Sequence, residues 1–177
     1  MFSGCALVTG PAAGSPFGMG CLYPLAQSPA GIYLACCNSA LAPTGPAAPI
    51  RLDALTSDEE QQKIISRDPF RYDGDIMNKT AYEFLKLCSA AKEAIPYIKV
   101  PFICLHGSAD EVTLPEGSDY LFEHTSTPTN LRQIIKFADL KHEIFHEREP
   151  DRTKVIAAVV SFIINFTETK SNTLRML

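Results

Sequence analysis

The chain has 177 residues, of which 46% are hydrophobic, with 20 acidic and 16 basic side chains. These values are typical of one globular domain that can bury a core, and they exclude a disordered tail and a coiled coil. The formal net charge of −4 and the lack of a Lys- or Arg-rich run predict no binding to nucleic acid. We therefore expect residues 1–177 to form a single domain.

The charged residues are distributed unevenly, because residues 1–50 contain no Lys, Arg, Asp or Glu. The first residues lack the basic charge of a signal peptide, and repeated prolines divide the stretch too often for a membrane-spanning helix. The six cysteines show no CxxC spacing and mostly have apolar neighbours, which favours reduced thiols over the alternative of one or two disulfides. We therefore expect a cytoplasmic protein.

The uncharged stretch begins with an apolar segment and continues with a long irregular one. Residues 4–9 form a short apolar run that Gly10 and Pro11 close, which predicts a strand buried on both faces. Residues 11–49 are rich in Pro, Gly, Ala and Ser, with scattered large apolar side chains. This composition is too hydrophobic for a flexible linker and too interrupted for a sheet, so we expect an excursion that covers another part of the molecule.

Two signals for the start of a helix follow. Residues 57–60 and 80–83 both have the pattern Ser/Thr-x-x-Glu. In such a capping box, a hydroxyl and a carboxylate three residues apart satisfy the free amides of the first helical turn. The first helix should end at Asp68-Pro69 and the second at Pro96, because the residue before a proline avoids helical geometry.

The second half of the chain alternates between strands and helices. Residues 100–106 form an apolar run that predicts a second buried strand, and residues 131–137 predict a third strand. Helices are expected at 113–122 and at 151–166, the latter with apolar residues at helical spacing. Strands that alternate with helices in this way imply right-handed crossovers. The predicted fold class is therefore α/β, with a parallel sheet of about three strands and flanking helices.

Two polar residues follow the predicted strands, where α/β proteins bind their ligands. Asp110 comes after the strand at 100–106, and His142 comes after the strand at 131–137. Taken singly, each is typical of an ordinary turn or a solvated loop. Together, an acid after one strand and a histidine after the next have the arrangement that orients an imidazole as a general base. Asp110 and His142 are therefore the candidate catalytic residues.

The motifs around these two residues resemble a known family. Residues 100–110, Val-Pro-Phe-Ile-Cys-Leu-His-Gly-Ser-Ala-Asp, and 141–147, Lys-His-Glu-Ile-Phe-His-Glu, resemble the C-terminal half of S33-like α/β-hydrolases of the monoacylglycerol lipase and lysophospholipase group. The resemblance implies a partial α/β-hydrolase fold in which residues 11–75 form a lid insertion. It also implies that Asp110 is the acid and His142 the base of a triad. The implied substrates are monoacylglycerols or related lipid esters, with no cofactor and no metal.

The resemblance lacks a nucleophile. The family places its serine on a GxSxG elbow ahead of the acid and the histidine, and this sequence contains no such motif. Ser15 is the closest imitation, but Pro16 has no backbone N–H to donate to an oxyanion. Cys36 and Cys37 have no flanking elbow glycines either. We therefore expect the elbow upstream of Met1, and a C-terminal fragment that hydrolyses no esters by itself.

Two other functions remain open. Residues 142–146 have the pattern HExxH, which in zinc metallopeptidases places two metal-binding histidines on one face of a helix. The motif begins five residues after the predicted strand and Pro150 follows it closely, so little room is left for that helix. The other alternative is a non-catalytic interaction module. The edge of the strand at 4–9 would then be exposed, which favours self-association.

The expected partners depend on the uncharged stretch. If residues 11–49 belong to a lid, their apolar side chains face lipid, which implies a lipid ester substrate and peripheral contact with a membrane. The same side chains could instead pack on the sheet. The sequence shows no amphipathic period that separates these two possibilities.

Overall fold

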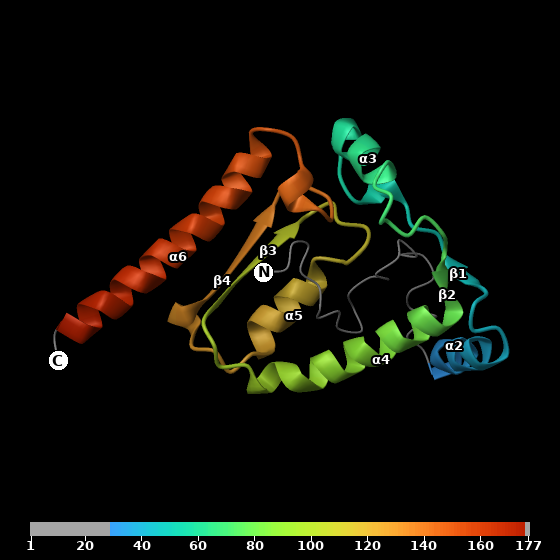
Figure 1. Cartoon of the computed structure of the whole chain (residues 1–177). Coiled ribbons are helices and arrows are strands. Elements are labelled where there is room, and N and C mark those ends of the chain that lie inside the picture. The colour runs from blue at the N-terminus through green and yellow to red at the C-terminus, as the bar shows by residue number, and fades with distance from the viewer. Residues whose placement is uncertain (1–28, 176–177) are drawn as a thin grey trace.

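A computed structural model describes residues 29–175 of the chain, with side chains for residues 31–167. The predicted strand at 4–9 lies outside the described residues. The described helices and strands are, in chain order, α2 (Pro29–Leu41), β1 (Pro46–Ala48), α3 (Glu59–Ser66), β2 (Ile76–Met77), α4 (Asn78–Ala94), β3 (Phe102–Gly107), α5 (Glu116–His124), β4 (Arg132–Phe137) and α6 (Asp151–Arg175). Figure 1 shows their arrangement.

β3 and β4 form the parallel sheet that the sequence predicts. They pair in register from Phe102 opposite Arg132 to Gly107 opposite Phe137. The connection between them contains α5, as the crossover of a parallel pair requires. The last four residues of β3 are buried, which explains the apolar composition of this segment. The α/β class is thus confirmed, with two of the three expected parallel strands in the described part of the chain.

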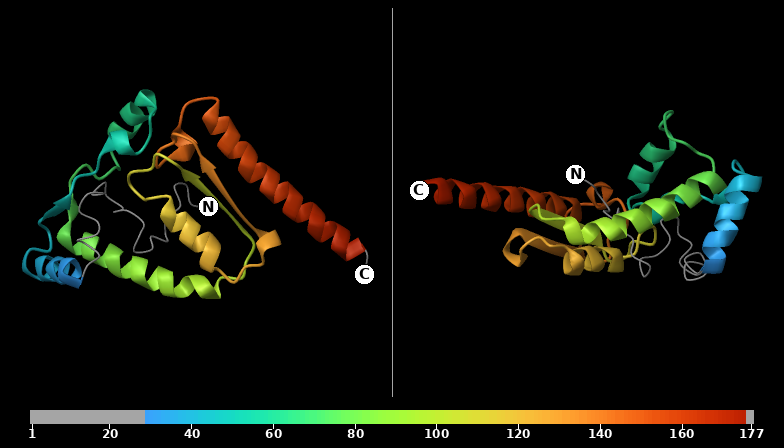
Figure 2. Two further views of the ribbon diagram at one scale, coloured as in Figure 1. Left: turned by 180° about the vertical axis from the view of Figure 1, so that it is seen from behind. Right: turned by 90° about the horizontal axis from the view of Figure 1, so that it is seen from below.

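The core lies between this sheet and the first half of α6. Its buried side chains come from β3, from the loop after β4 and from α6: Leu105, Leu140, Ile144, Val155 and Val159. Each aliphatic side chain of this size contributes about 1.5–3 kcal/mol when it is fully buried. In Figure 2, α6 continues beyond the sheet. Ile163, midway along this helix, is 52% exposed. Neither α6 nor any other described helix combines the length and the apolar character needed to cross a membrane.

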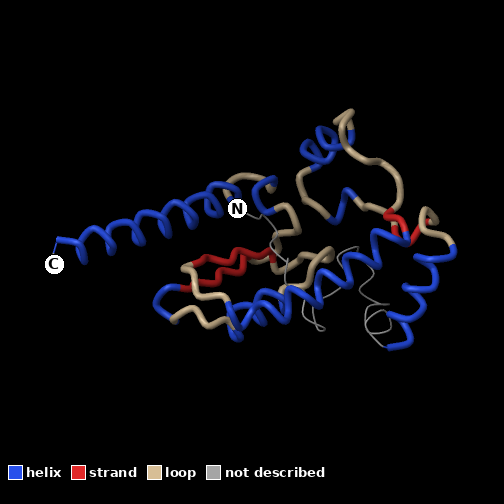
Figure 3. Tube along the Cα trace, turned by 60° about the horizontal axis from the view of Figure 1, so that its bottom comes forward, coloured by secondary structure: helices blue, strands red, loops and turns tan. Residues whose placement is uncertain are grey.

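A second group of elements consists of α2, α4 and the short strands β1 and β2. The two strands are antiparallel, and α2 packs against α4. Asn78 joins this group, because its backbone amide donates to the Gly45 carbonyl at 2.8 Å and its side chain donates to the Ala42 carbonyl at 3.0 Å. In Figure 3 the two strand pairs lie apart, and α4 spans the distance between them.

The sequence did not predict α2, since residues 11–49 were expected to form an excursion to which no helix was assigned. Pro29 occupies the first helical position, where its missing N–H costs no hydrogen bond, and the next proline is Pro43. Small and apolar residues occur on every side of α2, so its sequence has no helical period to detect. β1 and β2 have only three and two residues and were likewise not predicted.

The predicted helices are present, but their predicted capping boxes were wrong. The N-cap of α3 is Asp58, whose carboxylate accepts the backbone amide of Glu60 at 2.9 Å. The expected cap, Ser57, donates its hydroxyl to Glu147 instead. α4 starts two residues before the expected Thr80 and has no side-chain cap. At the start of α3, the Ser57 hydroxyl therefore makes a tertiary hydrogen bond, and it does not cap the helix as the capping-box pattern predicts.

Candidate active site

Asp110 is held firmly in the turn that follows β3. Its side chain is buried, with 2% of the residue exposed. Oδ1 accepts the backbone amides of Val112 and Thr113 at 2.8 and 2.9 Å, and Oδ2 accepts the Thr113 hydroxyl at 2.9 Å. Aspartate commonly stabilises turns by accepting amides a few residues ahead. The turn therefore fixes the direction in which the carboxylate points.

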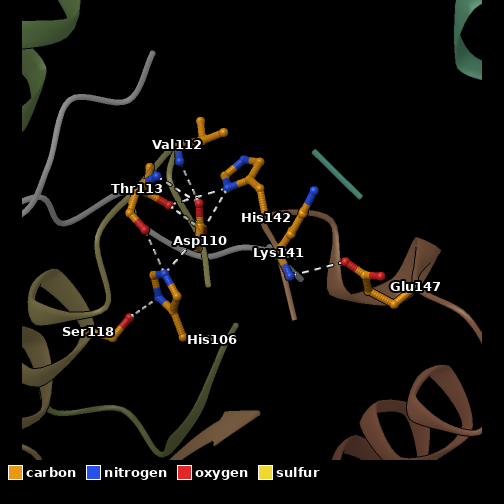
Figure 4. A network of polar contacts seen from close by, with 8 residues as sticks. All are labelled: His106, Asp110, Val112, Thr113, Ser118, Lys141, His142 and Glu147. Carbon is orange, nitrogen blue, oxygen red and sulfur yellow. Dashed lines mark hydrogen bonds and ion pairs between the residues drawn. The ribbon is translucent and has the colours of Figure 1, made fainter. Parts of the chain in front are cut away.

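His142 reaches this carboxylate from the turn after β4. Its Nδ1 atom lies 2.9 Å from Oδ2 of Asp110, as Figure 4 shows. An ionised carboxylate only accepts hydrogen bonds, so Nδ1 carries the proton and Nε2 keeps its lone pair. Nε2 points away from Asp110 and makes no hydrogen bond with any residue that the structure describes. The side chain is 19% exposed, so a reacting group can approach it.

The two turns meet because the carboxyl ends of parallel neighbours lie at the same edge of a sheet. The Ser108 amide donates to the Phe137 carbonyl at 2.8 Å. The Ala109 amide donates to the Leu140 carbonyl at 2.9 Å. Gly107 permits this approach, since a Cβ atom there would collide with the backbone oxygen of Leu140. The structure thus brings together the two residues that the sequence singled out.

A second histidine, which the sequence analysis missed, also contacts Asp110. His106 is fully buried at the end of β3, and its Nε2 atom lies 2.8 Å from the Thr113 carbonyl and 3.1 Å from Oδ2 of Asp110. Both oxygens accept hydrogen bonds, so Nε2 carries a proton. In the neutral ring, Nδ1 then accepts the Ser118 hydroxyl, 2.6 Å away. The sequence did contain one indication of this role, because His106 lies in a predicted buried strand, where a polar group without a hydrogen-bond partner destabilises the fold.

These contacts determine the ionisation of Asp110. Burial by itself raises the pKa of this carboxyl group. Hydrogen bonds from His106, His142 and the Thr113 amide outweigh that effect and hold the pKa of Asp110 well below its ordinary value of about 3.9. The carboxylate is therefore ionised at neutral pH, and it can stabilise a positive charge on the imidazole of His142.

The described residues supply no nucleophile to this pair. No serine or cysteine side chain among them forms a hydrogen bond with Nε2 of His142. Ser15 lies outside the described residues. Cys36 and Cys37 belong to α2, which Figure 1 shows at the end of α4 far from the sheet. His142 can therefore accept and return a proton, but the described residues do not supply a nucleophile that would give up that proton.

The HExxH pattern does not form a zinc site of the metallopeptidase type. Its residues form a turn followed by the short 3-10 helix Ile144–His146, and the continuous helix that the motif requires is absent. Nδ1 of His142 faces Asp110, whereas Nδ1 of His146 lies 3.2 Å from Oε2 of Glu143. Within residues 31–167, whose side chains the structure describes, no group of three His, Cys, Asp or Glu side chains could hold a metal ion. This geometry argues against the zinc alternative.

Parallel strands that are joined by a helical crossover and carry a hydrogen-bonded acid and histidine at their carboxyl ends are consistent with a partial α/β-hydrolase fold. A family model described as "Serine aminopeptidase, S33" matches residues 5–149, and the chain belongs to this family. The family resemblance of the sequence is thereby confirmed.

The chain is similar to solved structures, two of which are lipases by name. A monoacylglycerol lipase from Paleococcus ferrophilus matches with a TM-score of 0.63 and 26% identity, over 75% of this chain and 51% of that one. A soluble variant of monoglyceride lipase from Saccharomyces cerevisiae, solved with a substrate analogue, matches with a TM-score of 0.63 over 80% of this chain and 51% of that one. Its 16% identity shows the shared fold alone.

A relative of known name shares more of its sequence over a shorter stretch. Caffeoylshikimate esterase from Arabidopsis thaliana is 31% identical over 99 residues, which make up 56% of this chain and 29% of the esterase. The chain therefore spans about half the length of the two solved relatives and less than a third of this esterase.

Proposed function

We propose that Asp110 and His142 are the acid and the base of a serine ester hydrolase that acts on monoacylglycerols or related lipid esters. The observation that carries the proposal is the 2.9 Å contact between Nδ1 of His142 and the buried carboxylate of Asp110, which leaves a lone pair on Nε2. The family match supports the hydrolase class. The similar protein from Paleococcus ferrophilus, named as a monoacylglycerol lipase, supports the substrate class.

In this mechanism the pair acts on the hydroxyl of a serine on a GxSxG elbow, a motif that the 177 residues do not contain. Nε2 of His142 takes the hydroxyl proton while the serine oxygen forms a bond with the ester carbonyl carbon. The imidazolium then returns that proton to the alcohol oxygen as the carbon–oxygen bond to the leaving group breaks. Asp110 keeps the proton of the neutral ring on Nδ1 and stabilises the imidazolium.

We further propose that residues 11–75 form a lid that faces the lipid substrate. In the described part of this range, α2 carries large apolar side chains that are well exposed, with Tyr33 at 73%, Leu34 at 61% and Leu41 at 86%. Apolar surface of this kind suits peripheral contact with a lipid layer. Flotation with liposomes should carry the protein to the lipid fraction, and Leu34→Asp with Leu41→Asp should abolish that. Protein that stays in the soluble fraction would contradict the lid proposal.

The complete transcript tests the hydrolase proposal, because the mechanism requires an in-frame GxSxG elbow ahead of Asp110. The product that contains the elbow should hydrolyse monoacylglycerol and react with a fluorophosphonate probe. Asp110→Asn in that product should lower kcat by about 10⁴-fold, since the wrong tautomer of the histidine is then favoured. The 177-residue chain alone should not react with the probe. A transcript without an elbow, or a product inactive on monoacylglycerol, would overturn the proposal and favour the interaction module.

A further inference from the structure

Glu147 is a buried carboxylate that the proposed mechanism does not use. It lies five residues after His142, and 1% of the residue is exposed. No Lys, Arg or His side chain in the described part of the chain contacts its carboxylate. It is held instead by neutral donors, and keeping a carboxylate away from water in this way is costly unless those hydrogen bonds are made well.

The donors to Glu147 come from two distant parts of the chain. Oε1 accepts the backbone amide of Lys141 at 3.1 Å, and Figure 4 shows the carboxylate reaching back to that position. Both oxygens lie 3.2 Å from the amide of Ser57, whose hydroxyl also donates to Oε2. Lys141 directly precedes His142 in the chain. Glu147 therefore joins the turn that carries the candidate base to a segment about ninety residues earlier.

The joined segment, residues 51–58, runs alongside the His142 turn and is bonded to it repeatedly. The Glu143 amide donates to the Leu55 carbonyl at 2.7 Å. The Thr56 hydroxyl donates to the His146 carbonyl at 2.8 Å. Among these hydrogen bonds between described residues, Glu147 supplies the only charged acceptor. Hydrogen bonds to charged groups are stronger than those between neutral groups.

The 51–58 segment also reaches the turn of the candidate acid and belongs to the proposed lid. Arg51 lies 3.6 Å from the carboxylate of Glu111, which directly follows Asp110. This ion pair is exposed and contributes little by itself. Through this ion pair, however, the 51–58 segment contacts the Asp110 turn as well as the His142 turn. The segment lies within the proposed lid, residues 11–75. A displacement of that segment would be transmitted to His142 through Glu147 and the Lys141 amide.

We propose that Glu147 is a positioning residue, which together with Ser57 locks the 51–58 segment to the His142 turn and keeps Nδ1 of His142 aligned with Asp110. The catalytic consequence rests on the proposed function, whereas the alignment itself is a property of this chain. A merely structural role for Glu147 would lower the stability of the fold and leave the His142–Asp110 hydrogen bond of the folded protein unchanged.

The test measures that hydrogen bond in the 177-residue chain by NMR. The Nδ1 proton of His142 is assigned by its loss in His142→Gln, and its exchange rate with water is compared among folded variants. Glu147→Gln keeps the shape of the side chain but removes its charge and one acceptor oxygen. We expect exchange to become about tenfold faster, as the loss of one buried hydrogen bond implies. Glu143→Gln is the matched control on the same turn, because among the described residues the Glu143 carboxylate bonds to His146 alone, and it should leave the rate unchanged.

A second variant keeps the test decisive if Glu147→Gln fails to fold. Ser57→Ala removes the hydroxyl donor but keeps the backbone amide, so we expect faster exchange in the same direction, by a smaller factor. In the double variant, the increase in exchange should be smaller than the sum of the two single increases, because both substitutions remove the same Ser57–Glu147 hydrogen bond. Unchanged exchange in folded Ser57→Ala or Glu147→Gln, or fully additive effects, would overturn the proposal.

The measurement needs neither a nucleophile nor a substrate. An unchanged exchange rate therefore rejects the positioning role and leaves the proposed hydrolase function intact. If the product that contains the elbow is inactive on monoacylglycerol, the proposed hydrolase function is rejected, but the positioning role of Glu147 is not.

Discussion

The Nε2 atom of His106 lies 3.1 Å from Oδ2 of Asp110, the same oxygen that accepts the hydrogen bond from His142. One carboxylate oxygen thus connects two imidazoles, of which one is fully buried and the other partly exposed. His106 is in turn bonded to Ser118 in α5, so the candidate acid is tied to that helix as well as to its own turn. Asp110 cannot rotate away from His142 without leaving buried donors unpaired.

The first prediction concerns His106 itself. His106→Phe keeps an aromatic ring of similar shape but removes both hydrogen-bonding nitrogens, which leaves the buried Ser118 hydroxyl and Thr113 carbonyl without this partner. We expect the free energy of unfolding to fall by about 1–3 kcal/mol, as for other buried groups that lose a partner. Urea denaturation followed by circular dichroism measures the change.

The control for this variant is His124→Phe. His124 is exposed and stacks on Tyr120, and a phenylalanine can keep that stacking. Its effect should stay within about 0.5 kcal/mol, as is usual for surface positions. If both variants lost the same free energy of unfolding, the hydrogen bonds of His106 would not stabilise the fold as predicted.

The second prediction concerns the stability that Asp110 contributes at neutral pH. Asp110→Asn replaces an acceptor oxygen with an amide donor, which then faces the donors that Asp110 now satisfies. We expect a loss of about 1.5–3 kcal/mol, the range for hydrogen bonds to a charged group. Asp139→Asn is the matched control, because Asp139 is exposed and has a φ of 62°, a conformation that asparagine also tolerates. An equal loss in the control would show that the contacts of Asp110 contribute little.

The sequence was sufficient to predict the part of the site that lies at the ends of strands. β3 belongs to a largely apolar run, which is a strong signal for a buried strand, whereas β4 mixes apolar residues with Arg132, Gln133 and Lys136 and is only partly buried. Once two parallel neighbours are predicted, the residues that follow them must lie at the same edge of the sheet, which is why Asp110 and His142 were found. Their hydrogen bond therefore follows from topology and needs no knowledge of individual side-chain contacts.

The contacts around this pair could not be predicted, because no local pattern encodes them. His106 ends an apolar strand and has the pattern of a core residue, and its partner Ser118 is twelve residues away. The hydroxyl of Ser57 fits a capping box, yet it bonds to Glu147 about ninety residues later in the chain. Each of these side chains serves a tertiary network that only the folded chain assembles.

The third prediction concerns acid pH. The pKa of Asp110 is lowered in the folded protein, so its carboxylate stabilises the fold fully above the pKa of the unfolded chain, about 3.9. This stability is lost as the pH falls from that value towards the lower pKa of the folded state. The free energy of unfolding of the wild-type protein should therefore decline more steeply below about pH 4 than that of Asp110→Asn.

Urea unfolding of both proteins across this acid range tests the prediction. Other carboxylates titrate there too, such as Glu83, whose pKa is lowered to about 2 by hydrogen bonds from Lys79 and Lys86. Because Glu83 is present in both proteins, the difference between the two curves isolates Asp110. Curves that stay parallel down to the lowest pH would contradict the low pKa of Asp110.

The last prediction concerns the glycine that lets the two turns approach. A Cβ atom at Gly107 would collide with the backbone oxygens of Leu140 and Lys141, and backbone atoms cannot move aside as a flexible side chain can. Gly107→Ala should therefore push the His142 turn away from β3, and we expect a loss of about 1–3 kcal/mol from overpacking. Gly74→Ala is the control, because its nearest neighbours are atoms of the exposed Tyr72 side chain. Similar unfolding free energies for both variants, or an unchanged NMR signal of the His142 Nδ1 proton in Gly107→Ala, would show that the turns do not need this close approach.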